Sequence, residues 1–100
     1  MTYEQELDIF KDIVDEMTRV FANKRHDYGP TTTETFEKFG PLSMLVRMYD
    51  KLGRLTNLLG KEKSFVQESI DDTLMDLANY AVITILELRK EREKHCVKHK

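Results

Sequence analysis

The sequence predicts an all-α protein for two reasons. Apolar residues recur at steps of three and four in three long stretches, and no stretch alternates between apolar and polar residues as a strand does. With 100 residues, 40% of them hydrophobic, the chain can build one modest core. We therefore expect a single all-α domain over residues 1–100, a helical bundle of three main helices.

The first long helix is expected from about Tyr3 to Lys24. Thr2 followed by Gln5 is a capping-box pattern at its start. Its apolar stripe consists of Leu7, Phe10, Val14, Met17 and Phe21, widened by Ile13 and Val20. The segment KRHDYGPTTT then breaks the pattern, because Gly29-Pro30 cannot continue a helix, and only a short helical turn over Glu34 to Phe39 is expected after it.

The second long helix is expected from Leu42 to Leu59, between the Gly40-Pro41 break and a terminating Gly60. Its leucine-rich side is predicted to face the core. The residues on that side are Leu45, Tyr49, Leu52, Leu55 and Leu59.

The third long helix is expected from about Phe65 to Lys94, after a capping box of Ser64 and Gln67. One apolar sector holds Ile70, Leu74, Leu77, Ala81, Ile85 and Leu88. Between Ala81 and Leu86 the helix is apolar nearly all round, and such a helix is buried on several sides. In a chain this short the simplest cover is a second copy, so we expect a homodimer or a larger homo-oligomer.

Composition disfavours several classes of protein. The formal net charge of -2 argues against a general nucleic-acid binder, and the longest apolar run is shorter than the ~20 residues that a bilayer requires. The single Cys96 cannot form an internal disulfide, so we expect a cytoplasmic protein without membrane contact. Residues 95–100 are expected to be a frayed basic tail, in which His95, Cys96 and His99 are bystanders rather than zinc ligands.

Two polar stripes mark a candidate site. On the third helix, a set of residues falls within about 80° of one another: Glu68, Asp72, Asp76 and Asn79. On the second helix, another set gathers opposite the leucines: Arg47, Asp50, Lys51 and Arg54. Like charges four residues apart on a helix repel by roughly 0.2–0.5 kcal/mol per pair, so something must face the acidic stripe.

Three interpretations of the stripes are open at this point. The first is a ladder of ion pairs between the helices, which contributes only ~0–1 kcal/mol per exposed pair. The second is a divalent metal site, because carboxylates one turn apart, with Asp50, offer the oxygen ligands that Mg²⁺ prefers. The third is an anion pocket in which the basic residues bind phosphate.

The KRHDYG segment bears on the third interpretation. Lys24, Arg25 and His26 present donors suited to phosphate. The alternative is that they are simply the cations that a helix C-terminus favours. Tyr28 could stack on a base or cover the core.

Three ordered segments, KRHDYG, RMYDKLGRLTNLL and ESIDDTLMDLANYAVI, resemble the nucleotide-modification-associated domain family, small all-α proteins common in bacteriophage genomes. That family in turn looks like a relative of the MazG-like all-α nucleoside triphosphate pyrophosphohydrolases, which hold Mg²⁺ with an ExxE pair on one helix and an ExxD pair on the next. The resemblance implies a metal-binding role for Asp72, with Glu68 one turn before it, and Asn79 matches an Asn of many members. Where two glutamates are expected, this chain has Arg47 and Asp50, and Ser69 replaces the Glu of ExxD.

The resemblance and the stripes together predict a nucleotide-binding protein, with Mg²⁺-dependent (deoxy)nucleoside triphosphate pyrophosphohydrolysis as the leading hypothesis. Glu68, Asp72 and Asp76 are the expected catalytic residues and, with Asp50, the expected metal ligands. The expected nucleotide contacts are Lys24, Arg25, His26, Tyr28, Arg47, Lys51, Arg54 and Asn79. The alternative is a non-catalytic phage protein that sequesters nucleotides, or cyclic nucleotides of host defence, in the host cytoplasm; a third class is a purely structural interaction protein.

Overall fold

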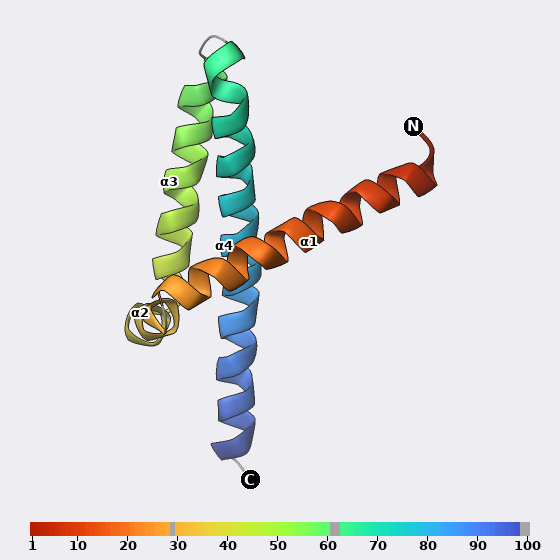
Figure 1. Cartoon of the computed structure of the whole chain (residues 1–100). Coiled ribbons are helices and arrows are strands. Elements are labelled where there is room, and N and C mark those ends of the chain that lie inside the picture. The colour runs from red at the N-terminus through yellow and green to blue at the C-terminus, as the bar shows by residue number, and fades with distance from the viewer. Residues whose placement is uncertain (29, 61–62, 99–100) are drawn as a thin grey trace. The chain divides into compact units, whose positions relative to one another are not determined.

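The chain folds into helices joined by short connections (Figure 1). The computed structural model describes the backbone of residues 1–28, 30–60 and 63–98, and the side chains of these residues except 27–28, 63–68 and 95–98. The helices are α1 (Tyr3–Tyr28), α2 (Thr31–Phe39), α3 (Leu42–Leu59) and α4 (Lys63–Lys98). No strand occurs in these ranges, so the predicted all-α class is confirmed. No helix in the described part of the chain combines the length and apolar character that a membrane span requires.

The chain divides into two compact units, Met1–Thr31 and Thr32–Lys100. The first unit contains α1, whose predicted capping box is present. The backbone N–H of Thr2 donates to Gln5 Oε1 at 2.8 Å, and the N–H of Gln5 donates to Thr2 Oγ1 at 3.1 Å. The helix continues to Tyr28, four residues beyond its expected end. Proline restricts the residue immediately before it, which here is Gly29, so the prolyl ring gives no reason for the helix to stop at Lys24.

The second unit begins with α2, which is a full helix from Thr31 and not the short turn expected from Glu34. Its Phe36 side chain is 1% exposed. Gly40 ends α2 with a φ of +73°, and its N–H donates to the Phe36 carbonyl at 2.7 Å. A residue with a side chain is strained at this φ, which explains the glycine.

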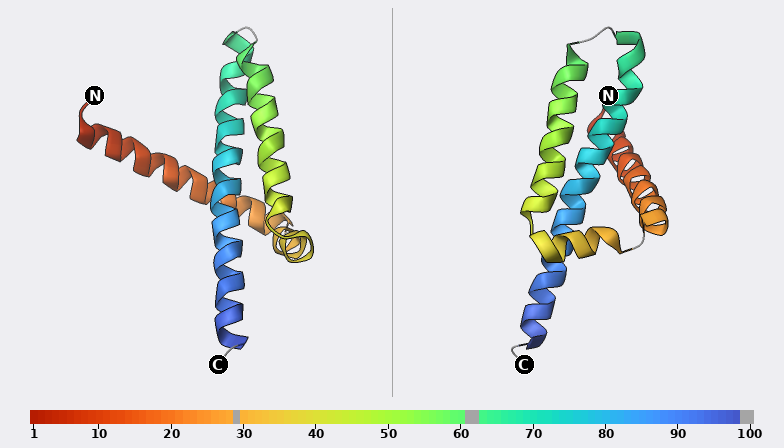
Figure 2. Two further views of the ribbon diagram at one scale, coloured as in Figure 1. Left: turned by 180° about the vertical axis from the view of Figure 1, so that it is seen from behind. Right: turned by 90° about the vertical axis from the view of Figure 1, so that its left-hand side faces the viewer.

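Helices α3 and α4 pack side by side in antiparallel directions (Figure 2). The bounds of α3 are those expected, and Gly60 caps its C-terminus by donating to the Asn57 carbonyl at 3.3 Å. Helix α4 is longer than expected at both ends. The predicted capping box of Ser64 and Gln67 lies outside the described side chains.

The apolar core of the second unit is small. Among the described side chains, the buried hydrophobic residues are Phe36, Met44 and Leu55. The prediction that the leucine-rich side of α3 faces the core is wrong for every member except Leu55. The other members are between 51% and 77% exposed; they are Leu45, Tyr49, Leu52 and Leu59. On α4, Leu74, Ala81 and Ile85 are exposed as well. The leucine-rich stripe of α3 therefore points away from α4, and the helices meet through another face.

A buried carboxylate holds α2 against α4. Glu87 is 2% exposed, and its Oε1 accepts hydrogen bonds from Thr33 Oγ1 at 2.9 Å and from Lys90 Nζ at 3.1 Å. Lys90 Nζ also lies 3.3 Å from Thr33 Oγ1. One helical turn further along α4, Lys94 Nζ pairs with Glu37 Oε1 of α2 at 3.0 Å. These contacts fix α2 near its start, at Thr33, and near its end, at Glu37, on the C-terminal half of α4.

Candidate functional site

The centre of the α3–α4 contact is polar. Three cations of α3 each meet a partner on α4, in the pairs Arg47 with Tyr80, Lys51 with Asp76, and Arg54 with Thr73. From Arg47 to Arg54 the α3 residues rise by four and then by three positions, and from Tyr80 to Thr73 their partners fall by four and then by three. This is the spacing of residues along the contact between two antiparallel helices. We call these six residues the polar seam.

Lys51 and Asp76 form the middle pair of the polar seam. Lys51 Nζ lies 3.2 Å from Asp76 Oδ2, and the two side chains are 28% and 26% exposed. One pair of the ladder that the sequence suggested is thus present. Because both side chains are only partly exposed, water screens the pair less than it screens a surface ion pair.

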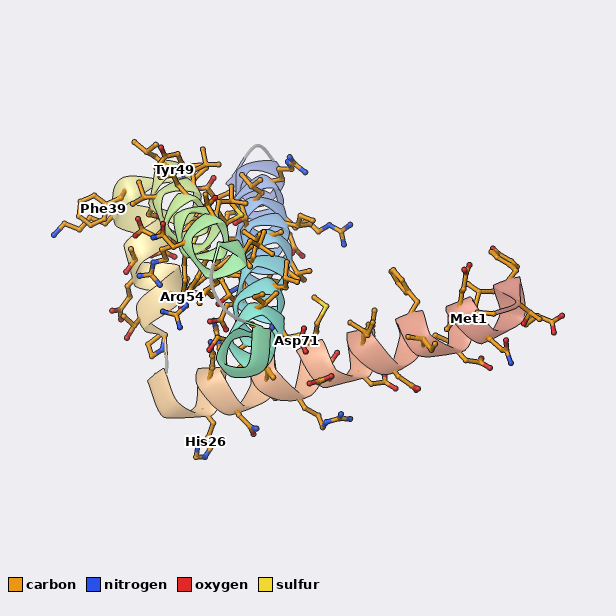
Figure 3. The ribbon with its side chains drawn as sticks, turned by 90° about the horizontal axis from the view of Figure 1, so that it is seen from above. Met1, His26, Phe39, Tyr49, Arg54 and Asp71 are labelled. Carbon is orange, nitrogen blue, oxygen red and sulfur yellow. The ribbon has the colours of Figure 1, made fainter. Side chains whose placement is uncertain are left out.

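The two arginines are held by neutral partners. Arg54 Nε donates to Thr73 Oγ1 at 3.2 Å, and the buried Thr73 hydroxyl donates to the Ser69 carbonyl at 2.6 Å. The guanidinium of Arg47 lies 5.9 Å from the centre of the Tyr80 ring, within cation–π distance. Figure 3, which looks along α3, shows Arg54 and the exposed Tyr49 on different sides of that helix. The cations and the apolar stripe thus occupy separate faces of α3.

Asn79 follows Asp76 by three residues on α4 and is 7% exposed. Its amide nitrogen Nδ2 is buried and has no hydrogen-bond partner among the described residues. A buried donor without a partner costs about 1–3 kcal/mol, and in native structures such a group calls for a water, an ion or a ligand. Among the described side chains, Asn79 is thus a group whose missing contact a water, an ion or a ligand could supply.

The other acidic residues of the predicted site are Asp50, Glu68 and Asp72. Asp50 and Asp72 are exposed, and the side chain of Glu68 lies outside the described residues. No group of three or more His, Cys, Asp or Glu side chains suited to a metal occurs in the part of the chain that was described. Because Glu68 is not among the described side chains, the metal role of Asp50, Glu68, Asp72 and Asp76 stays a prediction.

The basic residues of the KRHDYG segment belong to the other unit. Lys24 and His26 are exposed, Arg25 is half-buried, and each of the three residues takes part in an interaction within the structure. The side chain of Tyr28 is outside the described set. Their predicted contact with a nucleotide stays a prediction.

Sequence reasoning missed Thr73 and Tyr80. Thr73 precedes Asp76 by three residues and Tyr80 follows it by four, so all three lie on the same face of α4. The search for charged residues passed over them because one is neutral and the other aromatic. The spacing of Arg47, Lys51 and Arg54 on α3 is the signal that could have identified their partners.

Comparison with known proteins assigns the family. No match to a curated protein or to a solved structure was found. The sequence pattern described as Nucleotide modification associated domain 1 matches residues 24–88. The match runs from the last turns of α1 to the Leu88 position of α4 and includes all six residues of the polar seam. The chain therefore belongs to the Nucleotide modification associated domain 1 family.

Proposed function

We propose that this protein binds a nucleotide at the polar seam. The observation that carries the proposal is the buried Asn79 amide without a partner, which lies on the same helix face as Asp76 and close in sequence to the seam residues of α4. One explanation for such a costly group is that a bound molecule completes its hydrogen bond. The family of the chain concerns nucleotides, which carry both the anionic and the hydrogen-bonding groups required.

The chemistry of the seam suits phosphate. Arg47 and Arg54 offer planar guanidinium groups that can bind phosphate oxygens in pairs, and Lys51 adds a compact charge between them. Their contacts with α4 hold the side chains in place, so less conformational freedom is lost on binding. Asn79 then donates to an acceptor on the sugar or base.

Hydrolysis of the bound nucleotide is a separate step of the proposal. The resemblance to MazG-like enzymes implies Mg²⁺-dependent release of pyrophosphate at Asp72, with Glu68 one turn before it, and we add Asp76, one turn after Asp72, as a third catalytic residue. The described carboxylates do not gather around one point, and Asp76 is paired with Lys51. These contacts support binding more directly than cleavage, and they favour the second candidate, a non-catalytic nucleotide-binding protein of the phage type.

A ³¹P NMR experiment separates the candidates. The purified protein is mixed with ribonucleoside and deoxyribonucleoside triphosphates and with cyclic dinucleotides, with and without Mg²⁺. New monophosphate and pyrophosphate signals establish an enzyme. Shifted or broadened ligand signals without products establish a binding protein, and spectra unchanged across the whole panel contradict the proposed function.

A further inference from the structure

The Lys51–Asp76 pair includes one of the carboxylates that were expected from the sequence to bind a metal, Asp76, which lies one turn after the Asp72 that the resemblance implies as a ligand. Lys51 Nζ is 3.2 Å from Asp76 Oδ2, so the ammonium group already serves as a counter-ion for that carboxylate. A Mg²⁺ ion binds carboxylate oxygens at about 2.0–2.1 Å. An ion on Oδ2 would lie within a few ångströms of the ammonium group, and the two positive charges would repel each other strongly.

The neighbouring charges strengthen this conflict. Arg47 precedes Lys51 by one turn of α3 and Arg54 follows it by nearly one turn, so the cation that meets Asp76 lies between two further cations on the same face of α3. Asp50 and Asp72 are exposed, and neither gathers with Asp76 into a metal-binding group within the described part of the chain. A divalent ion therefore meets strong repulsion and few ligands there.

We propose that Lys51 replaces the divalent metal as the counter-ion of Asp76, so that the nucleotide phosphates are bound directly by Arg47, Lys51 and Arg54 without a metal. This inference rests on the proposed nucleotide binding. In this arrangement Asp76 orients the Lys51 ammonium group, and Thr73 and Tyr80 orient the two guanidinium groups. The ligand class is a phosphate ester or anhydride whose charge is balanced by the chain itself.

The first test uses metal without nucleotide. Mn²⁺ is added to the ¹⁵N-labelled wild-type chain, and paramagnetic broadening of backbone amide signals is followed. We expect no selective broadening at Asp72 or Asp76. Selective broadening of these two signals overturns the inference whatever the protein does with nucleotides.

The second test compares nucleotide affinity in EDTA and in Mg²⁺ by calorimetry, using the triphosphates and cyclic dinucleotides of the NMR panel. For the ligand that binds the wild type, we expect less than about a twofold difference between the two conditions, which is within a few tenths of a kcal/mol. Binding that appears only with Mg²⁺ overturns the inference. Absence of binding in both conditions contradicts the proposed function instead, and the Mn²⁺ result still decides the role of Lys51.

Variants test the assignment to Lys51. We expect Lys51→Gln to lose about tenfold or more in affinity in EDTA, because a charged hydrogen bond is removed, and Lys51→Arg to retain binding. Lys38→Gln on α2 removes the same charge away from the seam and is the matched control. Equal affinity of Lys51→Gln and wild type, with both folded by circular dichroism, overturns the inference.

Discussion

Asn79 is the residue whose state differs most between the free protein and the proposed complex. Its Nδ2 is buried without a partner among the described residues, and in the proposed complex a nucleotide would supply an acceptor. The same side chain is therefore expected to weaken the free protein and strengthen the complex.

Replacement of Asn79 by Leu tests that expectation. The variant removes a buried amide of similar size, so we expect the free energy of unfolding of the free protein to be unchanged or to rise by up to about 1–3 kcal/mol. We expect nucleotide affinity to fall in the same variant. Urea unfolding and calorimetry measure the two effects. Clear destabilisation of the free protein indicates that the amide has a structural role, and contradicts this account.

Lys94 gives a residue-level test of pH dependence. Its hydrogen bond to Glu37, and the charge of that carboxylate, raise the pKa of Lys94 above the ordinary value of 10.5. A raised pKa in the folded state means that the stabilisation is fully present below pH 10.5 and is lost as the pH rises through the folded-state pKa. The stability of Lys94→Met should therefore approach that of the wild type as the pH rises above the folded-state pKa of Lys94. Urea unfolding of both proteins across this pH range measures the difference. A difference that stays constant across this range contradicts the assigned cause.

At the scale of helices, apolar spacing in the sequence predicts where elements lie better than it predicts what they face. The start of α1 and both ends of α3 follow from Thr2, Gly40 and Gly60, which are local signals. The leucines of α3 form the stripe that their spacing predicts, but only Leu55 is buried. Periodicity identifies an apolar stripe, whereas its partner depends on contacts distant in sequence.

In the candidate site too, the sequence identified residues of the site better than it identified their partners. The cations Arg47, Lys51 and Arg54 were identified from the sequence, and Lys51 does meet Asp76. Their neutral partners, Thr73 and Tyr80, were missed because hydroxyl and aromatic groups give no charge signal. The burial of Glu87 was also missed, since a carboxylate is seldom buried unless it is paired.

A double-mutant cycle at Lys51 and Asp76 tests whether the polar seam is only structural. Because the side chains are partly exposed, we expect a coupling energy below about 1 kcal/mol for Lys51→Gln and Asp76→Asn. Nucleotide affinity should fall much more than stability in Lys51→Gln. Urea unfolding of the four proteins gives the coupling energy. A large loss of stability in these variants, together with no nucleotide binding by the wild type, indicates instead that the protein is a purely structural interaction protein.

Glu87 gives a test at the contact of α2 with α4. Glu87→Ala removes the acceptor of Thr33 and Lys90, and we expect it to cost about 1.5–3 kcal/mol of stability. Hydrogen exchange of the α2 amides should speed up in this variant. The matched control Glu34→Ala changes an exposed residue of α2 and should stay within about 0.5 kcal/mol of wild type. Equal exchange rates in both variants contradict the anchoring role of Glu87.

At the scale of the whole molecule, the homo-oligomer expected from the sequence stays a prediction, and the exposed apolar stripe of α3 is a surface on which it can be tested. Leu45, Tyr49 and Leu52 of α3 are all more than half exposed, and an exposed stripe of this kind marks an interaction surface. A second copy offers the same stripe, and two such stripes can cover each other in a symmetric contact.

Light scattering coupled to size-exclusion chromatography tests this prediction. We expect the wild-type chain to elute as a dimer or larger assembly, and Leu52→Glu to shift it toward monomer, because the new charge would be buried at the contact. Glu34→Lys, an exposed change on α2, is the control. A wild type that is monomeric at high concentration contradicts the prediction.

The central claim is that the polar seam binds nucleotide, and the most direct measurement is a ¹H–¹⁵N titration of the whole chain with the nucleotide panel. If nucleotide binds at the seam, we expect shifted amide signals concentrated between Arg47 and Arg54 on α3 and between Thr73 and Tyr80 on α4. We also expect the Nδ2 side-chain signal of Asn79 to move as its hydrogen bond forms. Saturable shifts that lie elsewhere on the chain, or no shifts with any nucleotide, contradict the claim.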